Sequence, residues 1–256
     1  PTLLAHAARV LPRVDLIALR EGRRGPDLLN RLGVDPRRVV VTGDDAIELA
    51  ASARSPQIGS GIGVCLRIAE YSPVAGRVVD EVRGALHTTS SEFEAHLVPL
   101  IISEYRSEDR RSTLPLVAGA EKEVPPLAPH VGARMVAQRV ARCRVIVTGA
   151  YHLAVFALAE GIPVVALTSS EYYDDKFHGL GGMFGGGVEL VHLDAADAGT
   201  TLAGAIRRAW EQAPALRPSL RAHADVQILQ SRAALDRVMD LVEAPVRRGD
   251  PVGAPA

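Results

Sequence analysis

Short β-branched apolar runs alternate with longer amphipathic stretches along most of this chain, and this alternation is what most constrains its fold. The pattern is typical of a parallel sheet covered by helices, because each parallel strand needs a crossover before the next one begins. Residues 39–41 (VVV) and 145–147 (VIV) are apolar on both faces, as buried parallel strands are. The sequence therefore predicts an α/β fold. The strands are expected at residues 14–20, 38–42, 62–68, 97–103, 144–148, 163–168 and 188–193.

Helical periodicity fills the intervals between these strands. The helices are expected at residues 26–32, 74–86, 131–141, 153–160 and 201–212, with one long final helix or a helix pair over 217–243. The chain also opens in a stretch that reads as a helix, and its first residue is not Met. We therefore expect an earlier segment of a longer protein to precede it.

A candidate interdomain linker lies at residues 52–61 (SARSPQIGSG), which are rich in Ser, Pro and Gly. It separates the end of an N-terminal α/β lobe, residues 1–55, from a fuller domain, residues 56–244. Residues 245–256 are rich in Pro and Gly and are expected to be disordered.

Composition removes several classes of function. The formal net charge is −1, so no basic footprint predicts binding to nucleic acid or to an anionic membrane. No apolar run reaches about 18 residues, so no membrane span is predicted. Cys65 and Cys143 lack disulfide or zinc spacing and suit a reducing cytoplasm. The histidines show no ligand spacing, so neither a metal site nor a cofactor is expected.

Candidate chemistry is concentrated in residues 141–180, which read as two consecutive strand–turn–helix units. In open parallel sheets, ligands bind at such turns, beside the N-termini of the helices, where backbone N–H groups favour an anion. The first turn carries Thr148, Gly149, Tyr151 and His152. His152 would lie in the first helical turn, where it can donate a hydrogen bond or transfer a proton. The alternative reading of His152 is a simple capping partner.

The second turn carries Ser169 and Ser170, either of which can cap the next helix, followed by Tyr172, Tyr173 and Lys176. A lysine near a helix start is disfavoured by the helix dipole, which suggests that Lys176 binds an anion. The alternative is a solvated surface lysine. Because Tyr172 and Tyr173 point in different directions on a helix, at most one of them is expected to face the site.

Residues at other strand ends fall on the same edge of the predicted sheet. Arg67 is a candidate clamp for a phosphate or carboxylate, with a surface salt bridge as its alternative, and Ser103 ends the next strand. Asp44 and Asp45 are interpreted as a helix cap in preference to an acid–base pair. The glycines of 59–63 precede a strand, whereas a dinucleotide fingerprint must follow one.

Several segments resemble the polysaccharide pyruvyl transferase family. They are LPRVDLIALREGRRGPDLLNRLGV with VVVTGDDAIEL (within 11–49), IGVCLRI (62–68), and TGAYHLAVFALAEGIPVVAL (148–167) with YYDDKFHGL (172–180). Their order and spacing agree with the family over most of residues 11–190. The last pair is the most specific.

The resemblance implies two Rossmann-like lobes that face a cleft, as in GT-B glycosyltransferases, with this chain supplying the C-terminal lobe and part of the N-terminal one. Members of the family move the enolpyruvyl part of phosphoenolpyruvate onto a sugar as a ketal, in carbohydrate biosynthesis and without a metal. On that template His152 matches the histidine near the reacting centre and Lys176 matches the lysine of a YDPK-like motif. Arg67 falls near a basic position at the end of the first strand of the domain.

One departure from the family leaves other functions open. The family usually has an arginine two residues before the histidine, and this chain has Ala150 there. Loss of a bidentate anion clamp makes a nucleotide-sugar-dependent GT-B glycosyltransferase the main alternative, and a non-catalytic binding domain of the same fold the next. The acceptor, the pathway and homo-oligomerisation are left open by the sequence.

Overall fold

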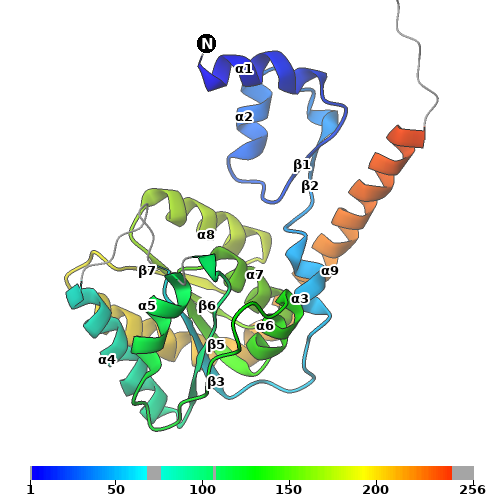
Figure 1. Cartoon of the computed structure of the whole chain (residues 1–256). Helices are drawn as coiled ribbons and strands as arrows, with labels where there is room; N and C mark the ends of the chain where they lie inside the picture. The colour runs from blue at the N-terminus through cyan, green and yellow to red at the C-terminus, as the bar shows by residue number, and fades with distance from the viewer. Residues whose placement is uncertain (1, 68–75, 106–107, 244–256) are drawn as a thin grey trace, which may run out of the picture.

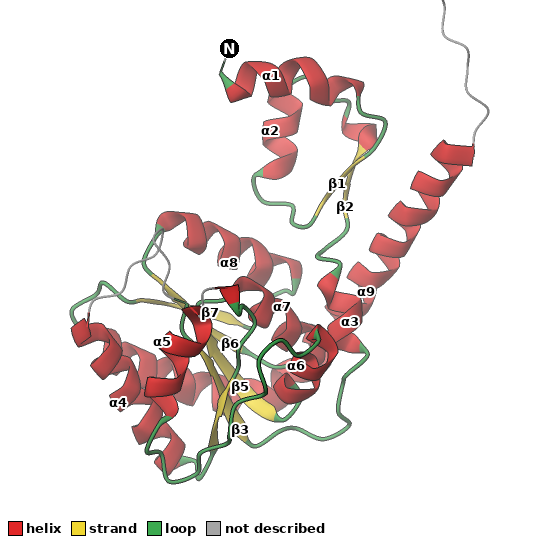
Figure 2. Cartoon of the chain, in the orientation of Figure 1, coloured by secondary structure: helices red, strands yellow, loops and turns green. Residues whose placement is uncertain are grey.

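A computed structural model describes residues 2–67, 76–105 and 108–243. In this part of the chain the strands form two separate parallel sheets (Figures 1 and 2). One has two strands, β1 (Ile17–Leu19) and β2 (Val39–Val41). The other has five strands in the order β4-β3-β5-β6-β7. We call residues 2–42 the small lobe and the described residues from 46 onward the large lobe.

All seven predicted strands are confirmed, each within a few residues of its expected position. The strands of the large lobe are β3 (Gly61–Cys65), β4 (His96–Pro99), β5 (Cys143–Thr148), β6 (Val164–Thr168) and β7 (Val188–His192). Every pairing is parallel, so all five carboxyl ends lie at one edge of the sheet.

Helices cover both faces of the five-stranded sheet, which gives the predicted three-layer α/β architecture. One face packs against α3 (Ala46–Ala51), α6 (Ala133–Val140), α7 (Tyr151–Glu160) and α8 (Glu171–Met183), through a core that includes Ile146, Leu153 and Phe177. The other face packs against α4 (Gly76–Glu92) and α5 (Glu108–Val117), through a core that includes Val82, Leu116 and Val145.

The final helix, α9, is a single element over Ala198–Glu243. The sequence predicted separate helical stretches over 201–212 and 217–243. Pro214 and Pro218 lie inside α9, although each removes a backbone donor and disfavours a helix interior. Packing compensates for this cost: Leu202 and Ile206 of α9 join one core, and Leu220 joins the other. The last turns of α9 run up beside the small lobe (Figure 1), where Arg237 Nη2 donates to the Arg37 carbonyl at 3.0 Å.

The small lobe consists of α1 (Leu3–Val10), α2 (Gly25–Arg31) and the two short strands, with single 3₁₀ turns at Leu11–Arg13 and Pro36–Arg38. The initial helix that the sequence suggested is therefore present. Among the described helices, none combines the length and the apolar character that crossing a membrane requires.

The expected linker, residues 52–61, follows α3 and lies between the two sheets in the sequence. Helix α3 packs on α7 through the buried Ile47 and Ala50. Beyond α3 the chain forms a loop on the large lobe, where Arg54 Nε donates to the Ala159 carbonyl at 2.8 Å. Where one folding unit ends and the next begins stays a prediction, and the tail from 245 lies outside the described residues.

Candidate functional site

Two strand–turn–helix units meet at the carboxyl edge of the five-stranded sheet, as the sequence predicted. The first turn joins β5 to α7, and the second joins β6 to α8. Opposite them lies the carboxyl end of β1 in the small lobe. The space between forms a cavity of about 270 Å³, which we call the inter-lobe cavity. It is lined by Leu19, Arg20, Glu21, Arg23, Arg24, Tyr151, Asp175 and Lys176.

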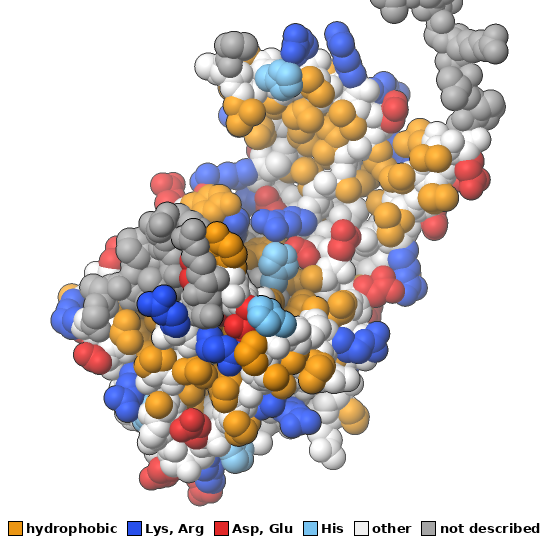
Figure 3. Space-filling view, in the orientation of Figure 1, with side chains coloured by type: hydrophobic (Ala, Val, Ile, Leu, Met, Phe, Trp, Pro, Cys, Tyr) orange, Lys and Arg blue, Asp and Glu red, His pale blue; other side chains and the backbone are white. Residues whose placement is uncertain are grey.

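The inter-lobe cavity is rich in cations. Four of its eight lining residues are Lys or Arg, against two carboxylates, and Figure 3 shows Lys and Arg side chains on the surface where the lobes meet. Asp175 is already paired with the small lobe, at 2.6 Å from Arg24 Nη1 and 3.6 Å from Arg23 Nη2. Among the described residues Lys176 forms no ion pair, and Arg20 Nη1 lies 3.8 Å from Asp44 Oδ2, which is outside the cavity lining.

Lys176 is held by aromatic rings. Its Nζ lies 4.1 Å from the ring centroid of Tyr172 and 5.1 Å from that of Tyr173, and no ion pair joins it to a carboxylate within the described ranges. A hydrogen bond from Lys176 lowers the pKa of Tyr172. Tyr172 is exposed whereas Tyr173 is buried, so the two tyrosines do face different ways. Cation–π contacts orient the ammonium without neutralising it, which leaves its charge for an anion.

Tyr151 forms the floor of the cavity beneath Arg20. The guanidinium carbon of Arg20 lies 4.5 Å from the centroid of the Tyr151 ring, and the Tyr151 side chain is buried. Burial raises the pKa of Tyr151 to about 12, so its phenol stays protonated and can only donate or accept a hydrogen bond. The stacked contact fixes Arg20 at the start of α7, beside Ala150.

His152 does not line the inter-lobe cavity. Its half-exposed ring points Nε2 toward Asp44 Oδ2 at 3.8 Å, and the same carboxylate oxygen lies 3.8 Å from Arg20 Nη1. Asp44 Oδ1 meanwhile accepts a hydrogen bond from the Ala46 N–H at 3.0 Å. Asp45 occupies the N-cap position of α3 without a side-chain capping bond, whereas Asp44 accepts from the first residue of that helix and also links His152 to Arg20. Thus His152 and Lys176 lie on either side of Arg20 and do not share this cavity.

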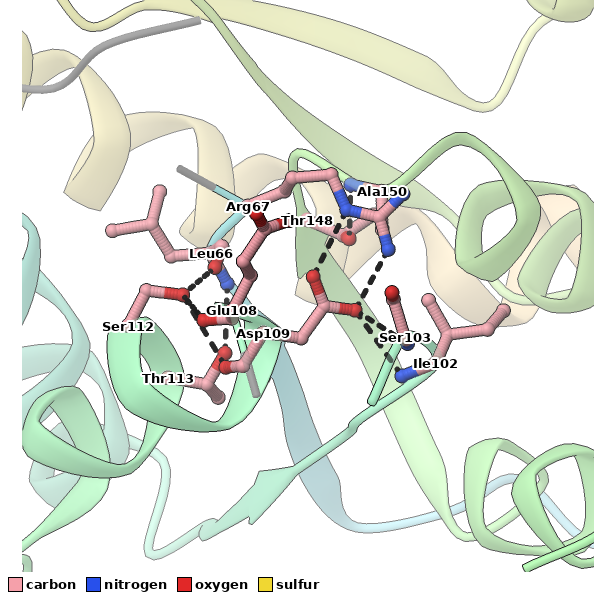
Figure 4. A network of polar contacts seen from close by, with 10 residues as sticks. All are labelled: Leu66, Arg67, Ile102, Ser103, Glu108, Asp109, Ser112, Thr113, Thr148 and Ala150. Carbon is pink, nitrogen blue, oxygen red and sulfur yellow. Dashed lines mark hydrogen bonds and ion pairs between the residues drawn. The ribbon is translucent and has the colours of Figure 1, made fainter. Parts of the chain in front are cut away.

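Arg67 is tied into the rim of the sheet (Figure 4). Its Nε and Nη2 donate to the two carboxylate oxygens of Asp109 at 2.9 and 2.7 Å, and Asp109 is fully buried. Asp109 also accepts from the backbone N–H of Ser103 at 2.8 Å and of Ile102 at 3.3 Å. The ion pair is thus a buried structural contact and not the surface salt bridge considered from the sequence. Donor binding by Arg67 and Ser103 stays a prediction.

Most polar groups of the first turn form hydrogen bonds within the protein. Thr148 Oγ1 accepts from the Ala150 N–H at 2.9 Å, as Figure 4 shows, and the Gly149 N–H donates to the Cys65 carbonyl at 3.0 Å. A Cβ on Gly149 would lie 3.3 Å from the Leu167 carbonyl oxygen, so a side chain here would make a tight contact with the backbone of β6. The N–H groups available to an anion at this turn therefore begin at Tyr151.

The second turn caps α8 differently from the expectation. Ser170 occupies the N-cap position, but its hydroxyl makes no capping bond and its Oγ is buried without a partner. The Thr168 hydroxyl stabilises the turn instead: it accepts from the Ser170 N–H at 3.3 Å and lies 3.2 Å from the Ser170 carbonyl. Ser169 follows β6 in the same turn. A direct role for Ser169 or Ser170 in donor binding stays a prediction.

The residues that sequence reasoning missed come from the small lobe. Arg20, Arg23 and Arg24 contribute most of the positive charge of the cavity, and Asp175 joins two of them to α8. A signal was present, because Arg20 ends the first predicted strand and EGRRG (21–25) directly follows it, at the carboxyl end of a parallel strand. Within the described residues, no group of three or more His, Cys, Asp or Glu side chains is arranged to hold a metal ion.

Comparison with solved structures places the fold among GT-B-like enzymes. A proposed UDP-N-acetylglucosamine 2-epimerase from Listeria monocytogenes gives a TM-score of 0.61 at 15% identity, covering 94% of this chain and 63% of that one. A glycosyltransferase from Rickettsia africae gives 0.57 at 12% identity, with 94% and 67% covered. The UDP-GlcNAc 2-epimerase of Neisseria meningitidis, bound to UDP-GlcNAc, gives 0.56 at 12% identity, with 85% and 59% covered. The chain thus spans less than two thirds of the first of these structures.

Comparison with family models is more specific. The polysaccharide pyruvyl transferase model matches residues 1–171, well over half of the chain. The chain therefore belongs to the polysaccharide pyruvyl transferase family. A comparison with curated protein sequences found no match.

Proposed function

We propose that this chain binds the donor of a transferase that moves a pyruvyl group from phosphoenolpyruvate to a sugar-containing acceptor. The observation that carries the proposal is the cationic inter-lobe cavity beside the first turn of α7. Phosphoenolpyruvate bears a phosphate and a carboxylate on a three-carbon frame, so it needs two cationic contacts a short distance apart. Arg20 and Lys176 are suitably placed on opposite walls of the cavity.

Arg20 can compensate for Ala150, which stands where the family usually has an arginine. A guanidinium binds phosphate or carboxylate through two parallel hydrogen bonds, which alanine cannot provide. Arg20 reaches the same turn from the small lobe and stacks on Tyr151, the residue after Ala150. In this proposal the bidentate clamp comes from the small lobe and not from the turn itself, which keeps phosphoenolpyruvate as the donor.

His152 would act as the acid in this reaction. Ketal formation requires a proton on the methylene carbon of the donor and attack of one sugar hydroxyl on the neighbouring carbon. Phosphate then departs and a second sugar hydroxyl attacks the same carbon, with each hydroxyl releasing its proton. The half-exposed imidazole of His152, beside the Asp44 carboxylate, is suitably oriented to transfer a proton. Its position outside the inter-lobe cavity implies that the methylene end of the donor projects past Arg20 toward His152.

The alternative donor is a nucleotide sugar. It is supported by fold likeness to enzymes that include one bound to UDP-GlcNAc. The size of the cavity favours the smaller donor, because about 270 Å³ is below the roughly 300–1,000 Å³ of typical sites for larger ligands. A nucleoside diphosphate would have to extend beyond it. The third reading, a non-catalytic binding domain, predicts binding without product.

Thermal-shift titration separates these readings, because a ligand that binds only the folded state raises the melting temperature. We expect phosphoenolpyruvate to stabilise the chain and UDP to have little effect. Arg20→Gln should abolish the shift, whereas Arg31→Gln, an exposed arginine on α2, should preserve it. A shift with UDP alone would favour the glycosyltransferase. No shift with either ligand would remove the basis for donor binding.

A further inference from the structure

A second cavity lies at the opposite end of the large lobe. Its volume is about 610 Å³, more than twice that of the inter-lobe cavity. It is lined at the amino edge of the sheet, where β3 starts at Gly61 and β4 starts at His96, and by Arg142, which directly precedes β5. We call it the basal cavity. Strands in register run from this edge to the inter-lobe cavity, so the two cavities are separated by the length of the sheet.

The wall of the basal cavity is held in place by hydrogen bonds. Residues 55–60 form this wall, and Arg221 Nη2 donates to the Ser55 carbonyl at 2.7 Å while Arg217 Nη2 donates to the Gln57 carbonyl at 2.9 Å. The Ser60 N–H donates to the Arg142 carbonyl at 3.2 Å. A cavity with a fixed wall binds a ligand without the cost of ordering a loop.

Gly59 shows how closely this wall is fitted to the lobe. A Cβ at this position would lie 2.2 Å from the carbonyl oxygen of Arg142, a separation that no side chain can adopt. The loop backbone therefore crosses directly over the peptide that leads into β5. Glycine is required here for close approach, so the loop cannot simply collapse into the cavity when it is empty.

The charge of the lining has one sign. It contains Arg139 and Arg142, and neither Asp nor Glu is among its residues. Arg139 Nη1 donates to the Pro125 carbonyl at 3.2 Å, a contact that leaves its charge intact. The Arg142 side chain forms no ion pair or hydrogen bond with any residue of the described ranges. Cations gathered without a neutralising carboxylate favour an anionic ligand.

The lining of the basal cavity also has apolar side chains, Ile58, Val98 and Val124, beside polar Ser and Gln residues. Its volume lies within the roughly 300–1,000 Å³ of small-molecule sites. We propose that the basal cavity binds a small organic anion, whose acidic group meets Arg139 and Arg142 and whose apolar body rests on Ile58 and Val98. This site is independent of the donor that we propose for the inter-lobe cavity.

The test uses 8-anilinonaphthalene-1-sulfonate, an organic anion whose fluorescence rises in an apolar site. We expect saturable binding to the chain, weakened roughly tenfold or more by Arg142→Glu, because a charge-assisted contact is replaced by repulsion. Arg134→Glu, on the exposed side of α6 and outside the cavity, makes the same change in net charge and should leave the affinity unaltered. Equal affinities for the two variants would overturn the proposal.

A blocking experiment locates the bound probe without altering charge. Cys65 and Cys143 are both buried, so in Gln57→Cys the introduced thiol is the reactive one. Labelling it with N-ethylmaleimide places a bulky group in the mouth of the cavity and should abolish probe binding. Unlabelled Gln57→Cys should bind as the original chain does. Full binding after labelling would show that the probe lies elsewhere, for example on the exposed apolar residues of α9, and would refute the site.

Discussion

At the scale of single residues, substitution of His152 is the most direct test of the proposed chemistry. His152→Ala should lower phosphoenolpyruvate-dependent phosphate release by roughly 10²–10⁴-fold, because proton transfer by a placed side chain contributes that much. His178→Ala is the matched control, since His178 is exposed on α8 and does not line the inter-lobe cavity. Release that is unchanged in His152→Ala would reduce His152 to a structural partner of Asp44.

Glu160 gives a prediction about stability that is independent of function. It is buried at the end of α7, neither carboxylate oxygen has a hydrogen-bond partner, and burial raises its pKa from 4.5 to about 9. Between these values the unfolded chain loses the proton while the folded chain retains it, so stability falls as the pH rises. The loss is at most about 1.4 kcal/mol per pH unit.

Glu160→Gln removes this titration. The variant should match the original chain near pH 5 and exceed it in the free energy of unfolding at pH 8, by an amount that grows with pH. Urea unfolding across this range measures the difference. Glu211→Gln, an exposed position on α9, should leave the pH profile unchanged. Parallel profiles for the original chain and Glu160→Gln would show that the Glu160 carboxyl is ionised in the folded state.

The position of a single residue could be predicted from the sequence where it depends only on the helix or strand that contains the residue. The turns that precede His152 and Lys176 are placed correctly, because the strands before them are continuous apolar runs. Arg20 and Asp109 were missed, since their importance depends on partners far away in the chain: Tyr151 for Arg20, and Arg67 for Asp109. No local pattern marks such partners.

At the scale of elements, Asp109 joins three of them. Asp109 lies in the first turn of α5 and accepts hydrogen bonds from the Arg67 side chain, after β3, and from two backbone N–H groups after β4 (Figure 4). Thr113 of the same helix accepts a hydrogen bond from the Leu66 N–H at 3.1 Å. Asp109→Ala should cost about 3–5 kcal/mol, because it leaves the Arg67 charge and two N–H groups without their partner. Asp236→Ala, exposed on α9, should cost little. Urea unfolding would contradict this if the two variants lost similar stability.

The strands were predictable because burial on both faces gives continuous apolar runs. Two of the helices were harder to predict. α5 contains a charged EDRR run and Pro115, which obscure helical periodicity, and its position depends on the buried Asp109. The unbroken course of α9 through Pro214 and Pro218 depends on tertiary packing, since a proline in a helix interior by itself favours a break.

At the scale of the whole molecule, ion pairs link the small lobe to the rest of the chain. Arg24 and Asp175 form an ion pair at 2.6 Å across the inter-lobe cavity, and Arg20 reaches the Asp44 carboxylate at 3.8 Å. Such contacts are individually worth up to about 1 kcal/mol and are screened by salt, over about 10 Å at 0.1 M. An anionic donor would therefore compete with Asp175 for the arginines of the small lobe.

That competition gives a prediction with a defined sign. Asp175→Asn removes the carboxylate that neutralises Arg23 and Arg24, so both become available to the donor. Phosphoenolpyruvate should bind roughly fivefold more tightly, as release from a pair worth about 1 kcal/mol implies, and the gain should shrink as salt is added. Asp194→Asn, exposed beyond β7, makes the same change in net charge and should not affect binding. Calorimetric titration at low and high salt measures both effects. Weaker binding to Asp175→Asn would mean that the ion pair holds the lobes in the binding geometry. The loss of that geometry would then reduce the affinity more than the freed arginines increase it.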